Sequence, residues 1–119
     1  MVQPAGTGAY YIRVANERAD DDRQRESILT WLKANDLQVR PEFRFEDEGF
    51  NRETPPANRP GLQKMLAGVR SGKLQWVVVD TLDRLKSAED PGLTAVLQVF
   101  KQAGGQLITL ETGEAVPLS

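Results

Sequence analysis

The sequence contains neither cysteine nor histidine. Without them there can be no Ser-His-Asp triad, no thiolate nucleophile and no zinc site of the usual kind. Any chemistry must therefore use hydroxyl groups, carboxylates, lysine or arginine, and we expect no metal and no cofactor. The absence of cysteine is also what a reducing compartment favours, so we expect a cytoplasmic protein.

Long apolar runs and a strong charge of one sign are absent as well. No stretch approaches the roughly 18 apolar residues that suggest a membrane span, and we expect no membrane association. Residues 1–8 lack the features of a secretory signal, so we predict a loose leader. The formal net charge of −2 argues against strong DNA binding by this domain alone, because nonspecific affinity comes mostly from cationic side chains. A DNA function would need a separate basic segment.

What the sequence does contain is an alternation of short apolar runs and amphipathic stretches. The 119 residues predict one α/β domain over residues 9–114, followed by a short tail at 115–119. We expect strands at residues 9–14, 37–45, 76–79 and 106–110, the second delayed or interrupted by Pro41. We expect helices from about residues 20–22 to Asn35, from Pro60 to Gly72, and from residues 90–91 to Gly104. Residues 46–58 hold few apolar side chains and predict a long exposed loop.

The order β-α-β-α-β-α-β predicts three layers, with a mostly parallel central sheet and helices on both faces. Two arginines lie where such sheets bind ligands. Arg13 is near the end of the first strand, and Arg84 lies just beyond the apolar run 76–79. The carboxyl ends of parallel strands meet at one edge of the sheet, and ligands bind there.

Five short motifs follow one another along the chain: Tyr11-Ile12-Arg13-Val14, Gln24 nine residues after Ala15, Asp47-Glu48-Gly49, Arg59-Pro60-Gly61-Leu62 with Met65-Leu66, and Leu82-Asp83-Arg84-Leu85. In this order and at these spacings they resemble the N-terminal catalytic domain of the serine recombinases, the resolvase and invertase family. The resemblance extends over about residues 10–114. It implies the resolvase catalytic-domain fold and a function in DNA recombination.

In that family a serine oxygen attacks a DNA phosphodiester, and charge builds on the phosphate oxygens. Guanidinium groups suit this task because they stay charged and hold two oxygens in one plane. By resemblance, Arg13, Arg59 and Arg84 would hold the phosphate. Asp83 would orient an arginine or handle a proton. Two further residues would act from a distance, Gln24 as support from the first helix and Asp47 by shaping the loop.

The chain departs from the family pattern at four places. Ala15 occupies the position of the nucleophilic serine and offers no oxygen. Ser87 replaces a second arginine, residues 47–52 lack a serine and a glycine of the loop, and Ala19 replaces a polar residue. Loss of a nucleophile has cost other enzymes about a millionfold in turnover. We therefore expect a homologue that is inactive in strand exchange.

Several alternatives stay open at the level of sequence. One is a chain engineered from serine to alanine at residue 15, and another is a protein-interaction module on the same fold. A further alternative is that Arg13 is a structural arginine paired with Asp47 or Asp83. For Arg84 the alternative is an ion pair with Asp83 at the surface. Residues 20–22 resemble a run of metal ligands, but a helix-capping cluster explains them better.

Family members continue into a helix that pairs two subunits and then into a basic DNA-binding region. This sequence contains neither. We expect contact with DNA through such a C-terminal region if the native chain is longer, and a homodimer is a further expectation from the resemblance.

Overall fold

The structure is a computed structural model that describes residues 4–14, 18–48, 59–85 and 92–117. Its elements follow in the order β1 (Gly8–Val14), α1 (Arg18–Ala34), the 3-10 turn η1 (Pro41–Phe43), β2 (Arg44–Glu48), α2 (Pro60–Arg70), β3 (Trp76–Val79), the 3-10 turn η3 (Leu82–Leu85), α3 (Gly92–Ala103), β4 (Gln106–Thr109) and β5 (Glu114–Ala115).

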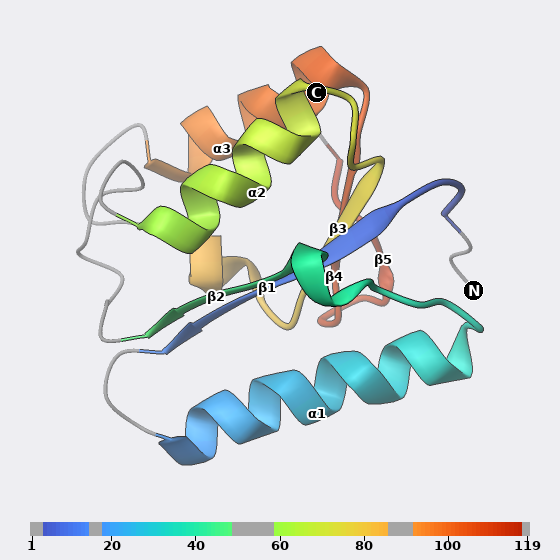
Figure 1. Cartoon of the computed structure of the whole chain (residues 1–119), viewed down its shortest axis with the longest axis vertical. Coiled ribbons are helices and arrows are strands. Elements are labelled where there is room, and N and C mark those ends of the chain that lie inside the picture. Colours follow the sequence, from blue (N-terminus) through green and yellow to red (C-terminus); the bar gives the residue numbers. More distant parts are fainter. Residues whose placement is uncertain (1–3, 15–17, 49–58, 86–91, 118–119) are drawn as a thin grey trace.

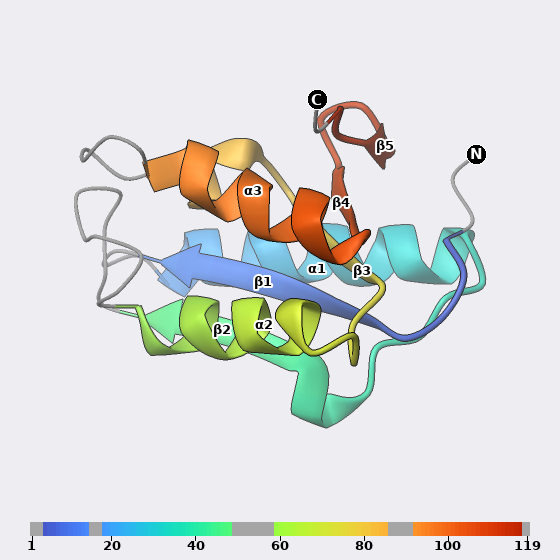
Figure 2. The same cartoon turned by 90° about the horizontal axis from the view of Figure 1, so that it is seen from above.

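The strands form one sheet in the order β2-β1-β3-β4-β5. The first four strands are parallel, and β5 pairs antiparallel with β4. Helix α1 covers one face, while α2 and α3 lie side by side on the other (Figures 1 and 2). The predicted three-layer α/β fold with a mostly parallel sheet is confirmed. The short β5 was not predicted, because a two-residue strand at the edge of a sheet has no periodicity to detect.

Each face of the sheet has its own apolar core. Side chains alternate along a strand, so Ala9 and Tyr11 face α2 and α3, whereas Tyr10 and Ile12 face α1. Residues 76–79 are buried throughout, as expected for a central strand covered on both faces. On the α1 side, the rings of Trp31 and Trp76 meet edge to face with centroids 6.4 Å apart.

The second strand and the loop after it differ from expectation. We predicted a strand at 37–45 and a loop at 46–58. The expected delay at Pro41 is confirmed, because Pro41 begins the turn η1 and β2 starts only at Arg44. The strand then continues to Glu48 because it pairs with β1 as far as Val14. The prediction of a loop is therefore wrong for residues 46–48, and residues 49–58 lie outside the described residues.

The ends of the folded body also extend further than predicted. Strand β1 begins at Gly8, and the backbone of Thr7 already exchanges hydrogen bonds with Gln75. A Cβ atom on Gly8 would lie 1.9 Å from the ring of Trp76, so this close approach requires glycine. At the other end, Val116 donates a backbone hydrogen bond to Leu107. Thr7, Gly8 and Val116, within the predicted leader and tail, thus contact the folded body.

Helix α1 begins at Arg18, before the acidic run at residues 20–22. The prediction that one of these aspartates caps the helix is therefore wrong. They lie in its first two turns, where acidic residues favour the positive end of the helix dipole. Helix α2 spans most of its predicted range and buries the predicted stripe, namely Leu62, Met65, Leu66 and Val69. Residues 90–91, the expected start of α3, are outside the described part.

Candidate functional site

The residues singled out in the sequence gather around the carboxyl edge of the sheet. Arg13 is the second-to-last residue of β1, and Asp47 is its neighbour in β2. Helix α2 begins at this edge, directly after Arg59 (Figure 1). Asp83 and Arg84 belong to η3, which follows β3 and contacts β1. Ala15, which the resemblance aligns with the family's nucleophilic serine, lies outside the described residues, one residue beyond the end of β1.

The side chain of Arg13 is 5% exposed. By alternation with Tyr11 it lies on the face of the sheet covered by α2 and α3. Strand β3 ends at Val79, so β1 continues past it and the peptide of Arg13 has no strand neighbour on that side. The position therefore needs another hydrogen-bonding partner for its backbone.

Gln24 supplies that partner from the buried side of α1. Its Oε1 accepts a hydrogen bond from the backbone amide of Arg13 at 3.3 Å, and its Nε2 donates to the carbonyl of Arg13 at 3.0 Å. The side-chain amide thus replaces the missing strand and is itself fully buried. The geometry gives Gln24 a support role through the backbone of Arg13.

Asp47 joins three elements. One carboxylate oxygen, Oδ1, accepts from the amide of Gly61 at 2.7 Å, and Oδ2 accepts from the amide of Leu62 at 3.0 Å. The hydroxyl of Tyr11 donates to the same Oδ2 at 2.7 Å. Helix α2 has no side-chain cap from Arg59, the residue before it, so Asp47 performs the capping from a neighbouring strand.

This contact depends on glycine at the second position of α2. A Cβ atom on Gly61 would lie 2.8 Å from the carbonyl oxygen of Glu46 and 2.9 Å from Oδ1 of Asp47. Asp47 also places a negative charge against the positive end of the helix dipole. The start of α2, which in other proteins attracts phosphate, is therefore already occupied by a carboxylate of this chain.

Arg59 is fully buried, at 0% exposure. It lies close to Tyr11, whose hydroxyl is affected by its charge and by a side-chain hydrogen bond. Burial, followed by the hydrogen bond and the charge of Asp47, raises the pKa of Tyr11 far above its ordinary value, and Arg59 offsets this only in part. Tyr11 is therefore a neutral donor to Asp47.

Sequence reasoning left Tyr11 without a role, although it lies in the first motif two residues before Arg13. Its partner in β2 lies 36 residues away along the chain, and only the strand pairing brings the two together. A second missed residue is Glu111, whose Oε1 accepts from the amide of Leu82 at 2.9 Å and from the hydroxyl of Thr109 at 3.2 Å. This contact holds the start of η3, which carries Asp83 and Arg84, against the end of β4.

The described residues contain no group of three or more acidic side chains arranged to hold a metal ion. In the same part of the chain, no helix has the length and apolar character needed to cross a membrane.

Comparison with known proteins agrees with this arrangement. The family model described as "Resolvase, N terminal domain" matches residues 8–117. A search of curated proteins found no match.

Among solved structures, the chain is similar to the N-terminal catalytic domain of TP901-1 integrase, with a TM-score of 0.76 and 23% identity over 92% of this chain and 81% of that one. It is also similar to the C-terminal catalytic domain of ISC1926 TnpA, described as an IS607-like serine recombinase, with a TM-score of 0.73 and 20% identity over 87% of this chain and 67% of that one. A third similar structure is the first open reading frame of transposon ISC1904 from Sulfolobus solfataricus P2, with a TM-score of 0.70 and 19% identity over 94% of this chain and 72% of that one.

At these identities the structures establish the fold. The family match extends over nearly the whole sequence, from the start of β1 past the end of β5. This chain therefore belongs to the resolvase N-terminal domain family, the catalytic domain of the serine recombinases.

Proposed function

We propose that this chain is a recombinase catalytic-domain homologue that takes part in DNA recombination without cleaving DNA itself. The observation that carries the proposal is Ala15, which follows the end of β1 where the family has its serine. A methyl group has no lone pair with which to attack phosphorus, so no phosphoserine link to DNA can form at this position. In other enzymes, loss of the nucleophile alone cost about a millionfold in turnover.

The presence of two arginines on neighbouring elements at the carboxyl edge of the sheet supports retention of a phosphate site. Arg13 and Arg84 lie on β1 and on η3, two elements that contact each other at the carboxyl edge. We assign the phosphate to these two arginines, with Asp83 orienting one of them. Arg59 is fully buried beside Tyr11 and contributes as part of the Tyr11–Asp47 support.

The net charge of −2 places the main affinity for DNA elsewhere. We propose that a basic region outside this sequence, or a partner subunit, supplies it. An interaction module on the same fold is the second candidate, and the acidic balance and the exposed outer face of α1 favour it. The two candidates differ in whether the arginines bind an anion.

The test restores the missing oxygen. The full-length native protein and its Ala15→Ser variant are incubated with fragmented DNA from the source cells, and protein–DNA adducts that survive detergent are counted. We expect none from the native chain, whose peptide mass must confirm alanine at residue 15. Adducts from the native chain would overturn the proposal, since another group would then be the nucleophile.

The Ala15→Ser variant tests whether the other residues of the site still support DNA cleavage. Adducts with Ala15→Ser that disappear in the double variant Ala15→Ser/Arg84→Ala would show that only the hydroxyl had been lost. The absence of adducts from both variants favours the interaction module. A titration of the native protein with inorganic phosphate, followed by backbone NMR shifts of β1 and η3, decides between the two, because the interaction module predicts no shift.

A further inference from the structure

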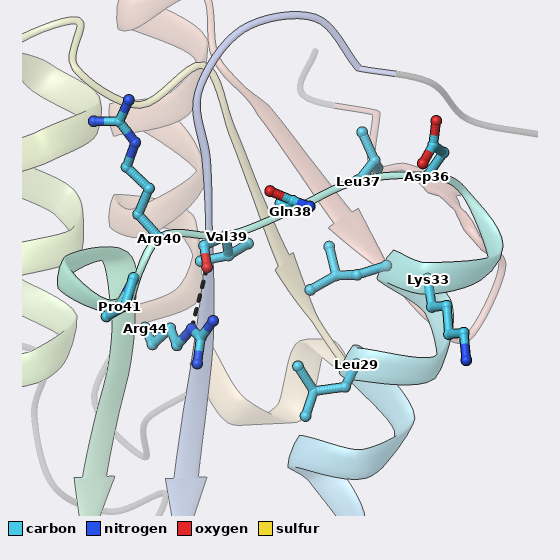
Figure 3. Close-up of a pocket in the computed structure, with 10 residues that line it drawn as sticks. Leu29, Lys33, Asp36, Leu37, Gln38, Val39, Arg40, Pro41 and Arg44 are labelled. Atoms are coloured by element: carbon cyan, nitrogen blue, oxygen red, sulfur yellow. Dashed lines mark hydrogen bonds between the residues drawn. The ribbon is translucent and has the colours of Figure 1, made fainter.

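A hollow of about 540 Å³ lies where the carboxyl-terminal end of α1 meets the segment that leads to β2 (Figure 3). Its volume falls within the range of about 300–1,000 Å³ that is typical of sites for small molecules. The lining combines an apolar wall with charged groups at its ends. The wall is made by Leu29, Leu32, Leu37, Val39 and Pro41.

Arg44, the first residue of β2, presents its guanidinium group to this hollow. Its Nε donates a hydrogen bond to the carbonyl of Val39 at 3.1 Å, which holds the side chain against the wall (Figure 3). The structure shows no hydrogen bond from its Nη1 or Nη2 to another described residue. Two N–H-bearing nitrogens of a positioned guanidinium group are thus available to a ligand.

The acidic side chains near Arg44 are engaged by other arginines. Glu46, two residues later on β2, binds Arg25 through two contacts, from Nη2 to Oε1 at 2.7 Å and from Nε to Oε2 at 3.2 Å. Glu42 lies 3.9 Å from Arg40 in an exposed ion pair. A positive charge therefore remains at the β2 end of the hollow, in a chain whose net charge is −2.

The two ends of the hollow differ in charge. Figure 3 shows Arg44 at one end, and Lys33 and Asp36 at the other. At the second end the carboxylate of Asp36 opposes the charge of Lys33, and the carboxyl end of a helix dipole adds negative potential. An anionic group is therefore favoured at the Arg44 end alone.

Apolar surface is open to water between these ends. Leu29 is 43% exposed, and it is the one large apolar side chain in the exposed class among the described residues. Leu32 and Val39 are buried and continue the same wall. A ligand that covers this wall removes apolar surface from water, which favours binding.

We propose that this hollow binds a small organic anion. Its carboxylate lies against Nη1 and Nη2 of Arg44, and its apolar body lies against Leu29, Leu32 and Val39. A guanidinium group suits this task because it stays charged and holds two oxygens of a carboxylate in one plane. The hydrogen bond from Nε to Val39 holds the side chain in place before the ligand arrives, so less conformational entropy is lost on binding.

The surroundings favour a small molecule over a long acidic partner chain. Asp22 and Glu26 are exposed along α1 next to the hollow, and they would repel such a chain. The hollow lies at the start of β2, whereas the arginine site lies at the carboxyl edge of the sheet, near the other end of that strand. The proposed ligand site is therefore independent of the function proposed above.

The test is a titration of the native chain with octanoate at neutral pH, followed by backbone NMR shifts. Octanoate carries one carboxylate, which is ionised at this pH, and an unbranched apolar body. We expect saturable shifts at the amides of residues 33–44, with a Kd of about 1 mM or below. Acetate lacks the apolar body and octan-1-ol lacks the charge, so each should bind at least about fivefold more weakly.

Three variants complete the design. Arg44→Met keeps an unbranched apolar stem but removes the guanidinium group, and it should raise the Kd for octanoate at least about fivefold. Leu29→Gln removes apolar surface from the wall and should raise the Kd about threefold. Arg70→Met makes the same change as Arg44→Met at an exposed position at the end of α2, and it should leave the Kd unchanged.

All three positions are exposed, and thermal unfolding followed by circular dichroism checks that each variant is folded. The absence of saturable shifts up to about 10 mM octanoate would overturn the proposal. Equal binding of octan-1-ol and octanoate, or an unchanged Kd in Arg44→Met, would overturn it as well. Octanoate shifts confined to β1 and η3 would assign the anion to the arginine site and have the same consequence.

Discussion

At the scale of single residues, the candidate site is held together by one carboxylate. Asp47 accepts hydrogen bonds from the hydroxyl of Tyr11 and from the amides of Gly61 and Leu62, and it is 3% exposed. Its carboxylate serves three elements at once, the strands β1 and β2 and the start of α2. Because all three donors are buried, their loss cannot be made good cheaply by water.

Asp47→Ala should therefore lower the free energy of unfolding by at least about 3 kcal/mol, from three buried donors at about 1–3 kcal/mol each. Urea denaturation followed by tryptophan fluorescence measures the change. The matched control is Glu42→Ala, which removes an exposed carboxylate a few residues earlier and should change stability by less than about 0.5 kcal/mol. Equal effects of the two substitutions would mean that Asp47 does not hold the site.

At the scale of elements, β1 extends past β3, and a side chain of α1 makes the backbone hydrogen bonds that β3 is too short to make. The amide of Gln24 pairs with both backbone groups of Arg13, so helix α1 and the end of β1 are connected two residues before Ala15. A glutamine on a helix is ordinary in sequence. Its role comes from the unequal lengths of two strands.

Gln24→Glu keeps an acceptor for the amide of Arg13 but removes the donor to its carbonyl. We expect a loss of about 1–3 kcal/mol in unfolding free energy, because a buried carbonyl is left facing a carboxylate. Hydrogen exchange at the amides of β1 should become faster at its carboxyl end and stay unchanged near Gly8. The same substitution at the exposed Gln38 is the control and should have no effect on either measurement.

At the scale of the whole molecule, β1 contributes to both cores and contains both tyrosines of the chain. Burial is the main cause that raises the pKa of Tyr10 and of Tyr11 above the ordinary value of about 10. Glu46 adds to the effect for Tyr10, and Asp47 adds to it for Tyr11. The unfolded chain would lose these protons near pH 10, whereas the folded chain keeps them.

The folded state therefore binds more protons than the unfolded state above about pH 10, and stability falls as the pH rises beyond that value. Below about pH 10 the two tyrosines are protonated in both the folded and the unfolded chain, so they add no pH dependence to the stability. We expect the ultraviolet absorbance of tyrosinate to appear at higher pH in the native protein than in urea. Tyr11→Phe should reduce the alkaline loss of stability. Two tyrosines that titrate near pH 10 while circular dichroism still reports the native fold would contradict this prediction.

The sequence by itself determined the features that depend on neighbouring residues. The continuous apolar run at 76–79 is a central strand, and Pro60 begins the helix whose stripe was predicted. The family motifs and the absence of a hydroxyl at Ala15 are likewise properties of the chain, independent of how it folds. These conclusions were available because period, turn chemistry and side-chain chemistry are local.

Only the tertiary structure decided what each polar residue of the site does. Residues 46–48 look like the start of a loop, yet pairing with β1 makes them a strand and turns Asp47 toward α2. Arg59 was expected to hold phosphate, and it is enclosed at the start of α2. Such contacts join residues far apart in the chain, so they depend on strand order and strand length, which no local pattern encodes.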